Sequence, residues 1–262
     1  MISYVIMDDE TVLQQKWEER ARRYQDDPRG VLFRGLPGAA NEAIHNWHEA
    51  VVRFHFAPLL PKNARILDIG AGYGRLSALI RQERPQSQLV GVDFSKVYCR
   101  IYAEKKIAHS ICADIRNLPF VQEIWDGILV VTTLMYIPQA QCHFTVKQII
   151  ACLKPGGVAL FIDPGLEIIR VLRRLSPGLK QKTTGGHGFD RTAYMDLVKG
   201  DNCIILSKGS NTFFTAFLPL FFMIEKIPWL ACKLGRLTGW MDHRIRLFTR
   251  FSLHRWVLIR RV

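Results

Sequence analysis

Short apolar runs alternate with longer stretches of helical periodicity over the middle of the chain. The runs have the apolar content of strands that are covered on both faces, and the stretches between them repeat apolar residues every three to four positions. The predicted strands are Arg65–Ile69, Gln88–Asp93, His109–Cys112, Gly127–Val131 and Val158–Ile162. One helix is predicted from the turn after the first strand to about Arg84, and two more are predicted over Lys96–Lys106 and Gln139–Leu153. This alternation predicts a doubly wound α/β fold, with a mostly parallel sheet and helices on both faces.

Two helices are predicted before the first strand. Residues 10–25 place Leu13 and Trp17 on one face with charges between them, and Asp26–Gly30 ends the pattern. Asn41 is expected to cap a second helix that runs to about Ala57. Such helices either close over a ligand site and exclude water or only cover an edge of the sheet. We therefore expect an N-terminal helical lid over residues 1–60 and a larger domain over residues 61–262.

After the fifth strand, a long insertion separates the last two predicted strands. Two more strands are predicted at Asn202–Leu206 and His254–Arg260, which makes a sheet of seven, and residues 211–253 form an insertion between them. The apolar run at 213–224 is shorter than the roughly 20 residues that span a bilayer, and nine Lys/Arg but one acid follow in residues 226–262. The insertion could contact a membrane peripherally or hold a lipid-linked anionic acceptor. The alternative is a helix pair that caps the domain or forms a dimer interface.

Composition and charge narrow the function classes. The 262 residues carry a formal net charge of +13, with 19 Lys/Arg against 17 Asp/Glu up to residue 164 and 17 against 6 after it. Such a basic segment suits nucleic acid, anionic lipid or an anionic small substrate. Six cysteines are scattered without metal-ligand spacing, so neither a disulfide framework nor a zinc site is predicted. The N-terminus has no basic region of a signal peptide, so we expect a cytoplasmic protein, or one peripheral at the inner face of a membrane.

A glycine-rich turn follows the first strand. Gly70, Gly72 and Gly74 fall at every second position, and helical spacing resumes at Leu76. Glycines let the backbone turn tightly and let a ligand lie against it, while the free N–H groups of the helix start attract an anionic or polar ligand. The dinucleotide fingerprint Gly-x-Gly-x-x-Gly does not fit, because Arg75 stands where its third glycine would be.

Acidic residues follow the next two strands. Asp93 ends the second strand, 23 residues after Gly70, and Asp114 follows the third. The carboxyl ends of parallel strands gather at one edge of a sheet, where ligands bind. The carboxylate of Asp93 can accept hydrogen bonds from a ribose diol. Asp114 can accept from an exocyclic amine while Ile115 packs on an adenine face.

Lys-Pro-Gly-Gly at 154–157 is predicted as a turn before the fifth strand. The ordered series from the glycine turn to this turn resembles the class I S-adenosylmethionine (SAM)-dependent methyltransferases over Ala64 to Asp163. The resemblance implies SAM as cofactor, no metal, and a seventh strand antiparallel beside the sixth. It also implies that Asp93 holds the ribose hydroxyls. The remaining cofactor-binding positions that it implies are Asp68, Gly70, Ala71, Gly72 and Gly74 at motif I and the methionine side, Phe94, Asp114 and Ile115 at the adenine, and Thr132 and Tyr136 in the cavity after the fourth strand.

Two motifs that the sequence lacks narrow the range of possible methyl acceptors. No Asn/Asp-Pro-Pro-Tyr/Phe run follows the fourth strand and no Pro-Cys pair occurs, which disfavours nucleobase methylation. A basic helix over Gly165–Leu179, a glycine- and threonine-rich loop and a helix at about Thr192–Lys199 are expected to open over the acceptor pocket. His187 in that loop is the candidate base, because its pKa lies near the working pH. A locally bonded His187 is the alternative. The other candidate bases are His143, His45 and His48.

These features predict a SAM-dependent O-methyltransferase that acts on a small-molecule or glycan- or lipid-linked acceptor, with transfer driven mainly by proximity and orientation. One alternative is an RNA ribose or tRNA methyltransferase that uses the basic C-terminal third. Nucleic acid is disfavoured, since that third does not show interleaved aromatic and basic residues for base stacking. Another alternative is an inactive SAM-fold protein that serves as a binding partner or membrane adaptor. A homodimer is compatible with the sequence.

Overall fold

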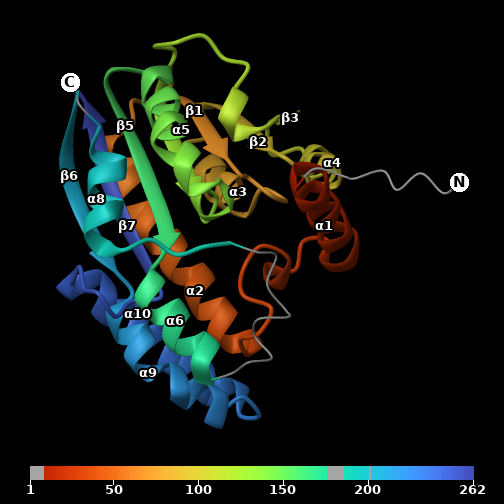
Figure 1. Cartoon of the computed structure of the whole chain (residues 1–262), viewed down its shortest axis with the longest axis vertical. Helices are drawn as coiled ribbons and strands as arrows, with labels where there is room; N and C mark the ends of the chain where they lie inside the picture. Colours follow the sequence, from red (N-terminus) through yellow and green to blue (C-terminus); the bar gives the residue numbers. More distant parts are fainter. Residues whose placement is uncertain (1–8, 176–185, 201) are drawn as a thin grey trace, which may run out of the picture.

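The computed structural model describes residues 9–175, 186–200 and 202–262, and they form a seven-stranded sheet flanked by helices (Figure 1). The strand order is β3-β2-β1-β4-β5-β7-β6. The strands from β3 to β5 run parallel, whereas β7 runs antiparallel to both β5 and β6. The strands are β1 (Arg65–Ile69), β2 (Gln88–Asp93), β3 (His109–Cys112), β4 (Trp125–Val131), β5 (Leu153–Pro164), β6 (Cys203–Ser210) and β7 (His254–Arg261). The predicted fold class is confirmed, and β1, β2 and β3 have the predicted bounds.

The segment at 154–157, predicted as a turn before the fifth strand, lies inside β5 instead. Leu153 already pairs with Trp125, and the ladder resumes with Val158 opposite Gly127. The four residues between therefore bulge out of the pairing. Gly156 takes a φ of +81° in this bulge, a left-handed conformation that glycine adopts without steric cost.

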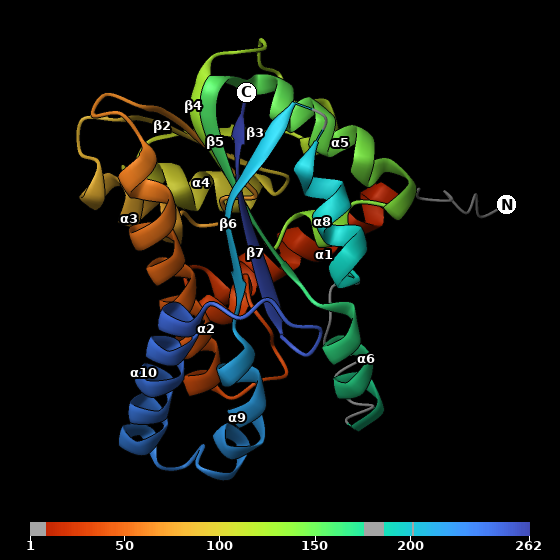
Figure 2. The ribbon, with the colours of Figure 1, turned by 90° about the vertical axis from the view of Figure 1, so that its left-hand side faces the viewer.

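Helices cover both faces of the sheet, as the nearly edge-on view of Figure 2 shows. One face is covered by α5 and α8, which bury Val146, Ile149 and Val198 against the strands. The other face is covered by α3 and the end of α2, which bury Leu79 and Trp47. The helices are α1 (Asp9–Tyr24), α2 (Gly38–Val51), α3 (Arg75–Glu83), α4 (Lys96–Glu104), α5 (Gln139–Cys152), α6 (Leu166–Leu175), α8 (Arg191–Lys199), α9 (Thr212–Met223) and α10 (Pro228–Ile245).

The second helix begins earlier than predicted, and Asn41 does not cap it. The helix starts at Gly38 after Pro37, and Asn41 is buried within it. Its side chain accepts the Phe33 N–H at 3.1 Å and donates to the Phe33 carbonyl at 2.8 Å. The α-helix ends at Val51 and continues as a π-helical turn, Val52–Phe56, and a short 3-10 turn, Ala57–Leu59, so the chain stays helical to Ala57 as predicted.

The insertion at 211–253 forms the helix pair α9 and α10, which lies beyond the end of the sheet next to α2 (Figures 1 and 2). Phe214, Phe221 and Leu234 belong to one apolar cluster with the start of α2. Asp242 of α10 accepts the backbone N–H groups of Phe213 at 2.8 Å and Phe214 at 3.0 Å, which ties the end of α10 to the start of α9. Within the described ranges, no helix is both long and apolar enough to cross a bilayer.

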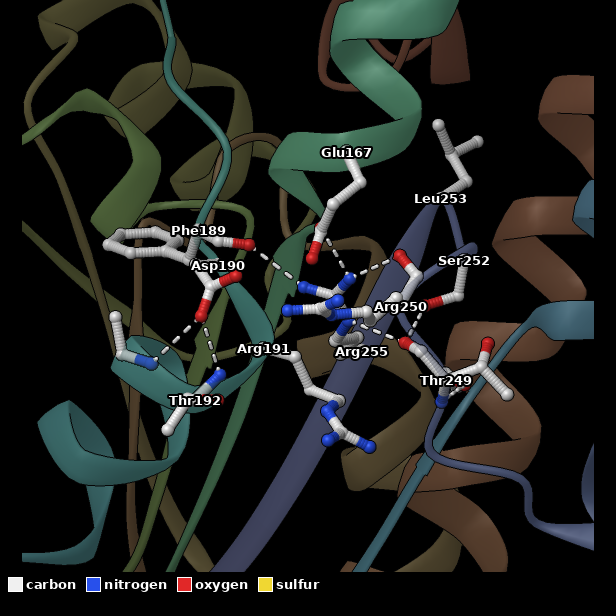
Figure 3. Close-up of polar contacts among 12 residues, drawn as sticks. Glu167, Phe189, Asp190, Arg191, Thr192, Thr249, Arg250, Ser252, Leu253 and Arg255 are labelled. Atoms are coloured by element: carbon white, nitrogen blue, oxygen red, sulfur yellow. Dashed lines mark hydrogen bonds and ion pairs between the residues drawn. The ribbon is translucent and has the colours of Figure 1, made fainter.

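A buried arginine joins several segments near the start of β7 (Figure 3). Arg255 is 1% exposed. Its guanidinium donates to the Glu167 carboxylate of α6 at 2.7 Å and to the carbonyls of Phe189 at 2.8 Å, Thr249 at 2.9 Å and Arg250 at 2.5 Å. The arginine thereby fixes α6 and the segment before α8 against the sheet.

Candidate functional site

A cavity of about 320 Å³ opens at the carboxyl ends of β1, β2 and β4. It lies where the sheet reverses its winding direction, the usual ligand position in such folds. Eight of the eleven predicted cofactor positions line it. They are Gly70, Gly72, Asp93, Phe94, Asp114, Ile115, Thr132 and Tyr136.

The glycine turn forms one wall of this cavity. The N–H groups of Gly70 and Ala71 donate to the Val92 carbonyl at 2.8 and 3.0 Å, which closes the turn against β2. Gly70 takes a φ of +72°, and a Cβ at this position would collide with the side chain of Thr133. Glycine is therefore required for conformation and for space, and the turn leaves bare backbone facing a ligand.

Asp93 is held in place by the backbone on both sides of it. One carboxylate oxygen accepts the Gly72 N–H at 2.8 Å and the other accepts the Ser95 N–H at 2.9 Å. Burial raises the pKa of Asp93 to about 6, although both hydrogen bonds favour the ionised form. Each carboxylate oxygen has a further lone pair, and Asp93 lines the cavity. The side chain is thus a fixed acceptor for a diol.

Asp114 follows β3, and its neighbour Arg116 lowers the pKa of its carboxyl group. Burial opposes ionisation of Asp114, but hydrogen bonds from the Arg116 backbone at 2.8 Å and guanidinium at 3.0 Å outweigh it and hold its pKa below the ordinary value. The Asp114 carboxylate is therefore ionised at neutral pH. Together with Phe94 and Ile115, which also line the cavity, it offers an acceptor beside two apolar surfaces.

Three predicted positions lie behind the cavity wall. Asp68 is 3% exposed and accepts the Ser77 hydroxyl at 2.7 Å, while Tyr102 donates to Ser77 at 2.9 Å. Burial raises the pKa of Asp68 to about 6. Gly74 begins α3 at a φ of +85° and faces Tyr102. With Ala71, these residues shape the glycine turn and the start of α3 and are not among the lining residues.

The helix α1 closes the cavity on the opposite side from the sheet. Its residues Val12, Leu13, Lys16 and Trp17 belong to the lining. The Trp17 ring meets the Tyr136 ring edge-on at 5.0 Å. The apolar face of the first predicted helix was a signal for this contact, whereas nothing in the sequence indicated that Val31, Tyr98, Arg116 and Thr133 would also line the cavity.

The end of β4 carries backbone strain at the cavity. Thr132 takes a φ of +54°, which is rare for a β-branched residue, and its N–H donates to the Ile162 carbonyl at 2.7 Å. Strain of this kind persists where surrounding structure enforces it, and it concentrates at ligand sites. Tyr136, four residues later, forms a side-chain hydrogen bond with Arg20 of α1.

His187 lies near the cavity without being part of its lining. Its backbone N–H donates to the Met135 carbonyl at 2.8 Å, and its ring packs on Phe189 with centroids 4.7 Å apart. Burial lowers the pKa of His187, against a hydrogen bond with the Met135 backbone. The ring is therefore neutral at pH 7, and its Nε2 atom is buried without a hydrogen-bond partner. A neutral ring with an unpaired nitrogen can accept a proton.

The other candidate histidines lie elsewhere. His143 is exposed on α5. His45 and His48 of α2 lie beside Arg75, with nitrogen–nitrogen distances of 3.2 and 2.8 Å, and His48 also meets His254 at 3.2 Å. These histidines belong to a polar cluster between α2, α3 and β7, and none of them lines the cavity. In the described ranges, His, Cys, Asp and Glu do not gather into a group that could hold a metal ion.

The family model described as a methyltransferase domain matches residues 66–157, from β1 to the bulge in β5. The match spans the glycine turn, Asp93 and Asp114. The chain carries a methyltransferase domain over these residues.

Curated relatives of the methyltransferase domain differ in their acceptors. The chain is 31% identical over 121 residues to malonyl-[acyl-carrier protein] O-methyltransferase of Priestia megaterium, covering 45% of this chain and 43% of that protein. It is 26% identical over 107 residues to the ubiquinone/menaquinone biosynthesis C-methyltransferase of Desulfotalea psychrophila. This match covers 39% of this chain and 42% of that protein. The chain thus aligns with less than half the length of these relatives.

A solved structure extends the likeness to the whole fold. Magnesium protoporphyrin IX methyltransferase from Synechocystis, with bound S-adenosylhomocysteine, superposes with a TM-score of 0.62 at 15% identity. The superposition covers 97% of this chain and 100% of that one. At this identity the comparison concerns the fold, including the parts of the chain outside residues 66–157.

Proposed function

We propose that the protein transfers the methyl group of SAM to an oxygen atom of a small-molecule or glycan- or lipid-linked acceptor. The observation that carries the proposal is the carboxylate of Asp93, fixed by the N–H groups of Gly72 and Ser95 inside a cavity at the strand ends. When bound, SAM supplies an electrophilic methyl group on a sulfonium, which becomes a neutral thioether as the methyl leaves. The chain itself has to bind SAM and the acceptor, align the acceptor oxygen with the methyl group, and remove the proton of the acceptor hydroxyl.

The proposed cofactor contacts follow from the cavity wall. Asp93 accepts the ribose hydroxyls, and the bare backbone at Gly70 and Gly72 lies against the methionine part. Asp114 accepts the exocyclic amine of adenine between Phe94 and Ile115. The wall at Thr132 and Tyr136 faces the methyl group and separates it from water. Asp68, Ala71 and Gly74 support this wall from behind.

The proposed base is His187, which takes the proton of the acceptor hydroxyl on Nε2 as the new C–O bond forms. The neutral state of its ring and the unpaired Nε2 atom support this role. His187→Ala should lower the transfer rate by about 100-fold, the usual contribution of a general base, and leave SAM affinity unchanged. His143→Ala, on the exposed side of α5, is the matched control and should not slow transfer. An unchanged rate in the His187 variant would remove it as the base.

The acceptor class can be tested with methyl-labelled SAM and an extract of the source cells. After incubation, label is counted in the water-soluble small molecules, in the lipid fraction and in RNA. Label in either of the first two fractions, released as methyl iodide by hydriodic acid, supports O-methylation. Label in RNA supports the tRNA or ribose alternative, and label that resists hydriodic acid indicates a carbon or nitrogen acceptor. SAM binding without any labelled product supports the adaptor alternative.

The pH dependence of SAM binding should follow the carboxyl group of Asp93. Because burial raises its pKa to about 6, protonation below that pH removes acceptor lone pairs from the ribose. SAM affinity should therefore be constant above about pH 7 and fall by up to about tenfold for each pH unit below 6. Calorimetry between pH 5 and 8 measures this. Asp68 titrates in the same range, so the Asp93→Asn variant is needed to tell the two carboxyl groups apart. This variant should bind SAM more weakly than the wild type, and its affinity should not vary with pH. An Asp93→Asn variant with the wild-type profile would assign the titration elsewhere.

A further inference from the structure

The helix α10 presents one continuous face to solvent. Its buried residues Ala231, Leu234, Thr238 and Asp242 lie on the side of α9 and α2. The exposed residues on the other side repeat at helical spacing. Six of them are here called the α10 face: Trp229, Lys233, Arg236, Leu237, Trp240 and Arg244. The face thus combines indole rings, basic groups and one aliphatic side chain, without an acid.

Both indole rings of the α10 face are largely in water. Trp229 is 63% exposed and Trp240 is 59% exposed, and the Lys233 ammonium lies 5.1 Å from the Trp229 ring. Tryptophan combines a large apolar body with one N–H donor, which suits the boundary between lipid headgroups and acyl chains. The C-terminal third therefore does interleave aromatic and basic side chains, contrary to the expectation from the sequence.

The end of α9 and the turn that follows it, residues 222–227 and here called the α9–α10 turn, add apolar side chains next to Trp229. Phe222 is 44% exposed, Met223 is 80% exposed and Ile227 is 40% exposed, and α9 contains no charged residue. Clustered exposed apolar residues indicate an interaction site. The most exposed of these side chains, Met223, and the aliphatic Ile227 gain from contact with hydrocarbon and offer no stacking surface to bases. The turn therefore favours lipid over RNA as the partner.

The charge of this region complements an anionic surface. Residues 211–253 hold six Lys/Arg and two acidic residues, Glu225 and Asp242. Asp242 is 3% exposed, with both carboxylate oxygens bonded to the backbone of Phe213 and Phe214. The Asp242 carboxylate is thus buried, so it offsets little of the positive charge at the surface. Glu225 is the exposed acidic residue of the insertion. Each Lys or Arg near an anionic bilayer raises partitioning by about fivefold.

We propose that the α10 face and the α9–α10 turn dock on the surface of a bilayer that contains anionic phospholipid. The indole rings lie at the headgroup level, Met223 and Ile227 enter the acyl boundary, and Lys233, Arg236 and Arg244 face lipid phosphates. Docking leaves the helix parallel to the membrane. It requires neither SAM nor an acceptor, so it stands apart from the proposed methyl transfer.

Vesicle flotation with the full chain tests the docking. Vesicles of phosphatidylcholine with 30% phosphatidylglycerol, about the anionic share that gives a strong surface potential, are compared with pure phosphatidylcholine. The protein should float only with the anionic vesicles. The double variant Lys233→Glu and Arg236→Glu should lower the partition coefficient by at least about 30-fold. The matched control, Arg100→Glu with Lys147→Glu, makes the same charge change on exposed positions of α4 and α5 and should bind like the wild type.

A second measurement uses the unaltered protein. Brominated acyl chains should quench tryptophan fluorescence on vesicle binding, because two of the six tryptophans would reach the boundary of the acyl region. Circular dichroism and SAM calorimetry on each variant separate a folding defect from a docking defect. Equal flotation of both double variants, absence of quenching, or loss of flotation with added polyuridylate would each overturn the proposal. So would a dimer in solution that Trp229→Ala with Trp240→Ala dissociates, because the face would then bind a second copy.

Discussion

Asp93→Ala is expected to lower the affinity for SAM by at least about 100-fold. The carboxylate would make two charge-assisted hydrogen bonds to the ribose, each worth about 1.5–3 kcal/mol, and alanine makes neither. The substitution also leaves the N–H groups of Gly72 and Ser95 without the acceptor that now holds the glycine turn against β2. Isothermal calorimetry with SAM measures the loss.

The control is Asp196→Ala, which removes an exposed carboxylate of α8 far from the strand ends and should leave affinity unchanged. Asp93→Asn should fall between alanine and wild type, because the amide oxygen still accepts one hydrogen bond. A folded Asp93→Ala protein that binds SAM within a few-fold of the wild type would show that another group holds the sugar.

Arg255→Met is expected to reduce the free energy of unfolding by about 3–5 kcal/mol, as is typical when one partner of a buried ion pair is removed. The methionine side chain fills similar space but leaves the Glu167 carboxylate and the carbonyls of Phe189 and Thr249 without their donor (Figure 3). At about 2–4 °C per kcal/mol for a chain of this size, the melting temperature should fall by about 10 °C. Thermal and urea unfolding measure the change.

Arg250→Met, five residues earlier and exposed, is the matched control and should change stability by less than about 0.5 kcal/mol. Arg255→Lys keeps the charge but cannot reach several acceptors at once with its single ammonium, so it should recover only part of the loss. Equal melting temperatures for Arg255→Met and Arg250→Met would show that the junction between α6, β7 and the segment before α8 does not depend on the guanidinium.

The strands were predictable because their signal is local. A buried parallel strand needs a run of apolar residues, and the bounds of β1, β2 and β3 follow from such runs. The error at β5 has a distant cause. Lys-Pro-Gly-Gly at 154–157 has the composition of a turn, but pairing of Leu153 with Trp125 carries the ladder past it. Asn41 was misread for the same reason, since its partner is the backbone of Phe33 and not a helix end.

The site was predictable where it depends on strand ends and not where it depends on tertiary contacts. Parallel strands bring their carboxyl ends together, so Asp93 and Asp114 could be placed at one cavity from order alone. The sequence gives no local sign that Asp68 turns away toward Ser77, or that His48 meets His254 across 206 positions. The position of His187 outside the cavity lining likewise depends on its bond to Met135, which no local pattern encodes.

The attachment of α1 has a consequence for turnover. Glu18 of α1 accepts the N–H groups of Lys96 at 2.7 Å and Val97 at 3.2 Å at the start of α4, and Gln14 donates to Phe94 at 3.2 Å. These polar contacts, together with the Trp17 ring and the hydrogen bond of Arg20 to Tyr136, hold the helix across the opening. A nucleoside that passes on this side requires these contacts to separate, so bonds that seal the cavity more tightly during reaction would also slow the release of product.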